Sequence, residues 1–176
     1  MVFGSKMTMH SPNNIPTADL AREYTRWKRS CHIGARDKRT RLIVVGPFDE
    51  DLVVLLGIIG RTNWDFSWWT SCAETVATLR EEIVPVVVVC ECDMPDGRWQ
   101  ILLAELPLLR EPPLLIFTSR RADERLWAEA VNLGAYDVLG KPFDPAEVVH
   151  VISSAFRAWH SNREARTPKK KLEKGA

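Results

Sequence analysis

The residues of this sequence best suited to chemistry are two acids, a threonine and a lysine, each placed just after an apolar run. Glu91 and Asp93 follow a valine-rich run, Thr118 follows the next apolar run along the chain, and Lys141 follows a third. A carboxylate, a hydroxyl and an ammonium that meet can form an ion pair with a supporting hydrogen bond. No nucleophile, base and orienting group fall together in the sequence, so we predict that the chain is not an enzyme.

The elements that must position these residues alternate between strands and helices. β-Branched and aromatic runs predict five strands, at residues 42–45, 64–69, 86–90, 114–117 and 137–139. Helical patterns follow each strand, at residues 49–59, 71–82, 99–106, 122–133 and 144–159. Such alternation predicts an α/β protein with a doubly wound parallel sheet. Ligands of such sheets bind at the carboxyl ends of the strands, which is where the four residues above are placed.

Local signals support the ends of these helices. Asp49, Glu50 and Asp51 form an acidic first turn, which stabilises a helix N-terminus. Ser71 and Asp144 each precede a glutamate by three residues, the spacing of a capping box. Gly134 is expected as the glycine that ends the helix before the last strand.

Three segments together resemble the receiver domain of bacterial two-component response regulators. They are residues 89–97 around the Met-Pro pair, 116–119, and 134–143 with its Lys-Pro-Phe run. The resemblance implies a flavodoxin-like (βα)5 receiver fold with strand order 2-1-3-4-5 over residues 41–160. It also implies a role in phosphorelay signal transduction, with a histidine kinase or a downstream regulator as the partner.

In receivers, a strand-three aspartate accepts a phosphoryl group, and that aspartate and an acidic pair after strand one hold magnesium. A hydroxyl residue and a lysine stabilise the phosphoryl oxygens, and these roles fall on Thr118 and Lys141 by resemblance. Pro142 matches the proline of the family, where the Lys-Pro bond is commonly cis.

The sequence departs from the receiver pattern at the remaining site positions. Glu91 occupies the acceptor position, Gly46 and Pro47 replace the acidic pair, and Val138 replaces the aromatic switch residue. A glutamate is one methylene longer than aspartate, and phosphoryl transfer depends on positioning. Gly46 and Pro47 offer no side-chain oxygen to a hard cation. We therefore expect no phosphorylation of Glu91, weak or absent magnesium binding, and no other cofactor.

These departures predict an atypical receiver that acts through protein–protein interaction without phosphorylation. In it, Glu91 either imitates the charge of an aspartyl phosphate or merely neutralises Lys141. One alternative is a working phosphorelay receiver that uses an unorthodox acid, Glu91 or Asp93, with Asp49 or Glu50 in place of the lost pair. The other alternative is a nucleic-acid-associated regulator whose basic tails supply the contacts.

Charge divides the sequence into three parts although the formal net charge is only +1. Residues 1–41 carry nine Lys/Arg against three Asp/Glu, residues 42–160 carry nine against eighteen, and residues 161–176 carry six against two. We expect a basic N-terminal extension over residues 1–40 with one short amphipathic helix, a folded domain over 41–160, and a disordered basic tail over 161–176.

The surroundings of the folded domain follow from the same composition. No apolar stretch approaches the roughly 20 residues of a membrane span, and no apolar leader begins the sequence, so we expect a cytoplasmic protein. Receivers commonly signal through the face of their last two helices and last strand, where Trp127 and Phe156 are the candidate contact residues. The predicted partner on this face is another signalling protein or, in a homodimer, a second copy of the chain.

Overall fold

The computed structural model describes residues 41–81, 85–94 and 99–166, and the predicted N-terminal extension lies outside them. The strands within these residues are β1 (Arg41–Val45), β2 (Asp65–Trp69), β3 (Pro85–Glu91), β4 (Leu114–Ser119) and β5 (Asp137–Gly140). The helices are α2 (Glu50–Ile59), α3 (Cys72–Glu81), α4 (Trp99–Glu105), the 3₁₀ turn η1 (Leu106–Leu108), α5 (Glu124–Asn132) and α6 (Pro145–Arg166).

The five strands form one parallel sheet in the order β2-β1-β3-β4-β5. The predicted fold class and strand order are therefore confirmed. Strands β1 and β3 lie in the middle of the sheet, and Leu42–Val45 and Val86–Cys90 are buried. Uninterrupted valine and isoleucine suit this position because a central parallel strand is covered on both faces.

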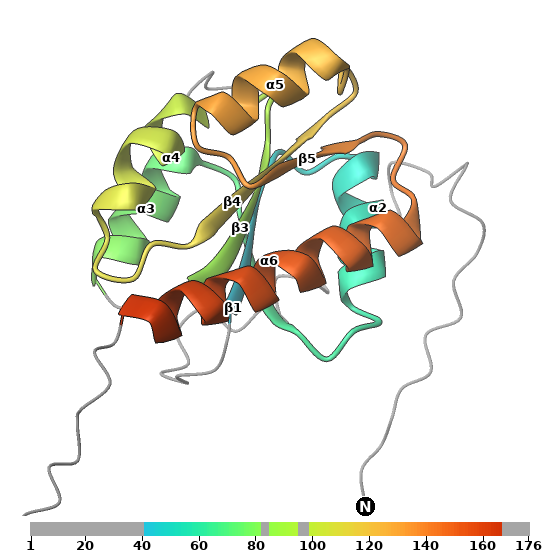
Figure 1. The fold of residues 1–176 in the computed structure, drawn as a ribbon. Coiled ribbons are helices and arrows are strands. Elements are labelled where there is room, and N and C mark those ends of the chain that lie inside the picture. Colours follow the sequence, from blue (N-terminus) through green and yellow to red (C-terminus); the bar gives the residue numbers. More distant parts are fainter. Residues whose placement is uncertain (1–40, 82–84, 95–98, 167–176) are drawn as a thin grey trace, which may run out of the picture.

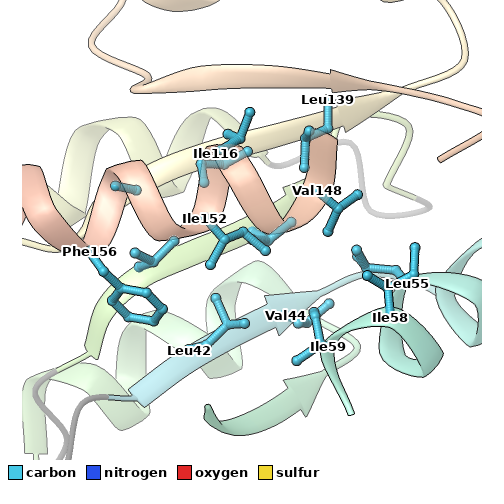
Figure 2. Close-up of a cluster of buried hydrophobic side chains, with 14 of the residues drawn as sticks. Leu42, Val44, Leu55, Ile58, Ile59, Ile116, Leu139, Val148, Ile152 and Phe156 are labelled. Carbon is cyan, nitrogen blue, oxygen red and sulfur yellow. The ribbon is translucent and has the colours of Figure 1, made fainter. Parts of the chain in front are cut away.

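Helices cover both faces of the sheet (Figure 1). Helices α2 and α6 lie on one face, and α3, α4 and α5 lie on the other. Figure 2 shows the first layer, where side chains of α2 and α6 pack against β1 and the neighbouring strands. Alternate residues of each strand enter opposite layers, so Ile116 packs under α6 while Phe117 packs under α4.

Aspartates begin three of the helices. Asp49 caps α2 by accepting the amide of Leu52 at 2.8 Å, and Asp123 caps α5 in the same way. Asp144 accepts the amide of Glu147 at 2.8 Å at the start of α6. Each side chain satisfies an amide that has no partner inside its own helix.

Helix α6 is longer than the sequence pattern predicts. The expected end near Trp159 is wrong by several residues because the helix continues to Arg166. Arg163 explains the added turn: its guanidinium lies 5.3 Å from the centre of the Trp159 ring and 3.3 Å from a carboxylate oxygen of Glu111. These contacts hold the exposed end of the helix against the domain.

Helix α5 ends as predicted, at a glycine in the left-handed region. Gly134 has φ 107°, its amide donates to the Val131 carbonyl, and the amide of Ala135 donates to the Ala130 carbonyl. This is the Schellman arrangement, in which the glycine avoids the clash that a side chain would suffer.

Gly134→Ala is expected to lower the free energy of unfolding by about 1–2 kcal/mol, because a Cβ at this φ is strained even though space is available. Urea denaturation would measure the change. The matched control is Gly140→Ala, where φ is not positive and the new Cβ would meet the nearest side-chain atom at an ordinary 3.6 Å. Equal losses in the two variants would contradict the strain argument.

Candidate functional site

The carboxyl ends of β1, β3 and β4 and the turn after β5 surround one pocket beside helix α2. Its walls combine an apolar side with a polar side on which three of the predicted site residues lie. The apolar lining is Val44, Val45, Leu52, Leu55, Val89 and Phe143, and the polar lining includes Asp49, Glu91, Thr118 and Lys141. The fold therefore places the pocket at the edge where doubly wound sheets bind their ligands.

Glu91 lies at the centre of the polar side. Its Oε2 accepts a hydrogen bond from Thr118 Oγ1 at 2.9 Å and forms an ion pair with Lys141 Nζ. Its Oε1 accepts the backbone amide of Asp93 at 3.1 Å. The Glu91 and Lys141 side chains are only 8% and 5% exposed, so each charge depends on the other for compensation.

Asp51 is a fourth member of the site that the sequence analysis missed. Its Oδ2 lies 3.2 Å from Lys141 Nζ and 2.7 Å from Nη2 of Arg120. The pattern indicated only a first-turn helix acid, and the one available signal was that α2 begins at the same edge of the sheet. A side chain in the first turn of such a helix can reach across to the lysine.

The two carboxylates keep Lys141 charged. Burial alone would lower the pKa of Lys141, but the hydrogen bond and charge of Glu91, followed by those of Asp51, raise it above its ordinary value. The ammonium also lies 5.9 Å from the centre of the Phe143 ring. Lys141 is therefore a cation at neutral pH.

Gly46 and Pro47 line the pocket without contributing a side-chain ligand. The Gly46 amide donates to the Trp69 carbonyl at 3.0 Å, and the Trp68 indole donates to the Gly46 carbonyl at 3.0 Å. These bonds tie the end of β1 to β2. A Cβ added at Gly46 would lie 3.5 Å from Cβ of Glu91, which is an ordinary contact.

The neighbouring acids have other tasks. Asp49 is the cap of α2, and Glu50 is exposed on its first turn. Asp93 is 56% exposed and its carboxylate lies 3.5 Å from Arg121, so it does not enter the pocket. The sequence thus brings Glu91, Thr118 and Lys141 together as expected, whereas the carboxylate of Asp93 points elsewhere.

The position of the switch aromatic lies on the other face of the sheet from α6. Val138 is buried beside Phe117 in the layer under α4 and α5. The Lys141-Pro142 bond is cis, in agreement with the expectation from the resemblance. In the register of the sheet, Thr118 pairs with Leu139 of β5. Position 138 places a valine, and so no aromatic ring, near Thr118.

The cysteines nearest the pocket are not reactive thiolates. Burial, followed by the charges of Glu91 and Asp93, raises the pKa of Cys92 to about 12. Cys90 and Cys72 are buried with their sulfur atoms 3.9 Å apart, and contact with Cys72 and burial raise the pKa of Cys90. Cys90 and Cys92 therefore stay protonated at neutral pH.

The two candidate contact residues have different surroundings. Trp127 is 49% exposed on α5, and its indole donates to Oδ1 of Asp137 at 2.9 Å. Phe156 is buried, and its ring lies 5.4 Å from that of Trp64. The prediction that Phe156 contacts a partner is therefore wrong, because its position on α6 faces the sheet.

Across residues 41–81, 85–94 and 99–166, no group of three or more His, Cys, Asp or Glu side chains is arranged to hold a metal ion. None of the helices in these ranges is long and apolar enough to cross a membrane.

No protein-family model matches the chain. Among curated proteins, Protein CcdB of Bacillus subtilis is 25% identical over 114 residues, which cover 65% of this chain and 95% of that protein.

Solved structures give a consistent answer about the fold. The signal receiver domain of an HD domain-containing protein from Pseudomonas fluorescens Pf-5 matches with TM-score 0.65 and 21% identity, covering 77% of this chain and 98% of that one. A CheY-like response regulator receiver domain protein from Methanospirillum hungatei JF-1 matches with TM-score 0.59 and 18% identity over 70% and 98%. The beryllofluoride-activated NtrC4 receiver domain, a dimer, matches with TM-score 0.60 and 22% identity over 68% and 98%. The chain therefore has the fold of response regulator receiver domains.

Proposed function

We propose that this chain is an atypical receiver that takes part in signal transduction by binding another protein, without accepting a phosphoryl group and without catalysing a reaction. The proposal depends on one observation above all. Thr118 and Lys141, the two residues assigned to phosphoryl oxygens by resemblance, both bind Oε2 of Glu91. The side chain at the acceptor position thus occupies the groups that would stabilise a transferred phosphoryl group.

The chemistry of Glu91 supports a constant signalling state. Its carboxylate reaches one methylene further than aspartate and brings negative charge to the hydroxyl and the ammonium. An aspartyl phosphate carries more charge and more acceptor oxygens, so the imitation is partial. The buried, fully paired carboxylate has little freedom to attack a phosphoryl donor, because transfer requires the attacking oxygen in line with the leaving group.

The side chains present do not fit magnesium. This cation prefers several hard oxygen ligands in octahedral geometry, and Gly46 and Pro47 supply none. The carboxylates of Glu91 and Asp51 are already bridged by Lys141, whose ammonium supplies the positive charge between them. We therefore propose that the signalling state of this chain does not depend on magnesium.

Trp127 supports a protein partner. A half-exposed indole that is fixed by Asp137 offers a large apolar contact with little loss of side-chain freedom on binding. We propose that the partner is another signalling protein that contacts α5 and β5, or a second copy of the chain. The alternative of nucleic acid as the partner depends on the basic segments, most of which lie outside the described residues.

A phosphoryl-donor assay tests the proposal. The native chain, incubated with magnesium and acetyl phosphate, is expected to show no gain in intact mass. The triple variant Gly46→Asp, Pro47→Asp, Glu91→Asp is the matched positive control, because it restores the acids of the receiver pattern and a Cβ at position 46 makes only an ordinary contact. This variant is expected to gain the mass of one phosphoryl group, since it regains the acid set and keeps Thr118 and Lys141.

The same two proteins with beryllofluoride, followed by tryptophan fluorescence, give an independent readout. A change in the triple variant alone would support a phosphorylation-independent native chain. A gain of mass by the native chain would overturn the proposal, and peptide mapping would then distinguish Glu91 from Asp93 as the acceptor.

A further inference from the structure

Asp51 and Arg120 connect the pocket to a surface loop. Asp51 lies in the first turn of α2, and Arg120 directly follows the last residue of β4, in the loop that leads into α5. One oxygen of Asp51, Oδ2, lies within ion-pair distance of both Arg120 and Lys141. A single carboxylate therefore links three elements: helix α2, the turn after β5 and the β4–α5 loop.

The surroundings make this contact stronger than an ordinary surface ion pair. Arg120 is 68% exposed, and an isolated pair at such a position contributes little. Asp51, however, is only 17% exposed and is already oriented by the buried ammonium of Lys141. Charges that form a network with a buried member lose less freedom when they pair, which is the condition under which such contacts matter.

Arg121 provides a natural comparison in the same loop. It carries the same charge on a neighbouring residue, but its partner Asp93 is largely exposed and the contact is 3.5 Å long. The side chain of Arg121 is 83% exposed. By the same reasoning, the Arg121–Asp93 contact places little constraint on the loop.

We propose that Asp51 is a positioning residue that holds Lys141 on Glu91 and, through Arg120, holds the β4–α5 loop against the pocket. We call the Asp51–Arg120 pair the latch. Through the β4–α5 loop, the latch connects the pocket to helix α5. This connection does not require the aromatic switch residue that receivers carry at the position of Val138. The latch deepens the proposed function, because it adds a means by which the Glu91–Lys141 pair reaches the surface that bears Trp127.

The charge of Asp51 has a separate effect on Lys141. Asp51 is one of the two acids that raise the pKa of Lys141. Asp51 therefore acts on the lysine, which we call the inner end of the latch, and through Arg120 on the β4–α5 loop, which we call its outer end. A residue that merely fills space would affect neither the lysine titration nor loop exchange selectively. The two ends therefore supply two independent readouts.

Amide hydrogen exchange measured by NMR tests the outer end. The amides to follow are those of Asp123, which donates to the Arg121 carbonyl, and Leu126, which donates to the Asp123 carboxylate. Arg120→Gln and Asp51→Asn are each expected to accelerate their exchange roughly five-fold, with no further acceleration in the double variant because both remove one contact. Arg120→Lys, which keeps the charge, is expected to retain most of the protection.

The inner end is tested by following the Lys141 ¹³Cε resonance through an alkaline titration. The apparent pKa of Lys141 is expected to fall in Asp51→Asn and to stay unchanged in Arg121→Gln. Additive exchange effects of Asp51→Asn and Arg120→Gln, or equal effects of Arg120→Gln and Arg121→Gln, would overturn the latch. Neither experiment uses a phosphoryl donor, so the latch can fail while the proposed function stands, and the reverse is also true.

Discussion

Replacing Lys141 with methionine is expected to lower the free energy of unfolding by about 3–5 kcal/mol. The substitution leaves Glu91, which is buried, with a hydroxyl as its remaining side-chain partner, and it removes one of the two cations beside Asp51. A buried carboxylate without its counter-charge costs far more than the packing of a methionine recovers. Urea denaturation at pH 7 measures the loss as a shift in midpoint at constant slope.

Two variants separate this effect from a general effect of removing charge. Arg80→Gln breaks an exposed ion pair with Glu105 and is expected to change stability by less than about 1 kcal/mol. The double variant Glu91→Gln, Lys141→Met removes both charges of the buried pair and is expected to recover part of the loss. A Lys141→Met loss no greater than that of Arg80→Gln would show that the pocket is better solvated than its burial indicates.

The pH dependence of this contribution has a definite sign. The pKa of Lys141 is raised in the folded state, so folding favours the charged lysine. Its contribution to stability is complete below the ordinary lysine pKa of about 10.4 and is lost as pH rises through the higher folded value. The difference in stability between the native chain and Lys141→Met should therefore narrow in alkaline solution as Lys141 of the native chain loses its proton.

The parts of the fold that sequence reasoning could predict are those set by local patterns. The valine-rich run at β3 and its bounding loops identify a central strand, and Gly134 marks the end of α5 because few other residues adopt its backbone conformation. Placement of Glu91, Thr118 and Lys141 at one edge then follows from the parallel order of the strands. Each of these inferences needs only the residues of one element and a general rule of topology.

The parts that could not be predicted depend on contacts between elements distant in sequence. The sequence pattern indicates Asp51 as a first-turn helix acid, and only the position of the start of α2 near the turn after β5 brings it to Lys141. The sequence does not give the rotation of α6 about its axis, so the prediction places Phe156 on the surface. In the structure that rotation buries Phe156 against Trp64. Hydrophobic periodicity predicts which residues form the apolar face of a helix, but it does not predict which elements that face packs against.

The same limit explains why two readings of Glu91 remained open from sequence. An acid at the acceptor position fits both a vestigial pocket and a fixed signalling state. The geometry adds that Glu91 binds both phosphoryl-stabilising residues and that Asp51 extends the network to the exposed Arg120. A pocket that only neutralised its own lysine would need no such connection to the surface, and this favours a fixed signalling state.

The largest expected change away from the pocket is at the far end of α6. Trp159→Ala is expected to lower the free energy of unfolding by about 3–5 kcal/mol, since it removes a buried indole from the layer between α6 and the sheet. It also removes the hydrogen bond from the indole nitrogen to the Pro112 carbonyl, 2.9 Å long, and the ring that supports Arg163. Residues after 160 would then lose their contacts with the domain, so amide exchange there should rise toward that of an unstructured chain.

Trp159→Phe separates packing from hydrogen bonding in this effect. Phenylalanine keeps most of the buried ring and loses only the donor, so we expect a loss of about 1–2 kcal/mol and continued protection of the helix up to Arg163. Equal losses for the two variants would mean that the hydrogen bond to Pro112 dominates and that ring packing contributes little. If neither variant changed amide exchange after residue 160, the end of α6 would be stabilised by its own helix propensity. The contacts of Arg163 with Trp159 and Glu111 would then not be the reason that the helix extends past its predicted end.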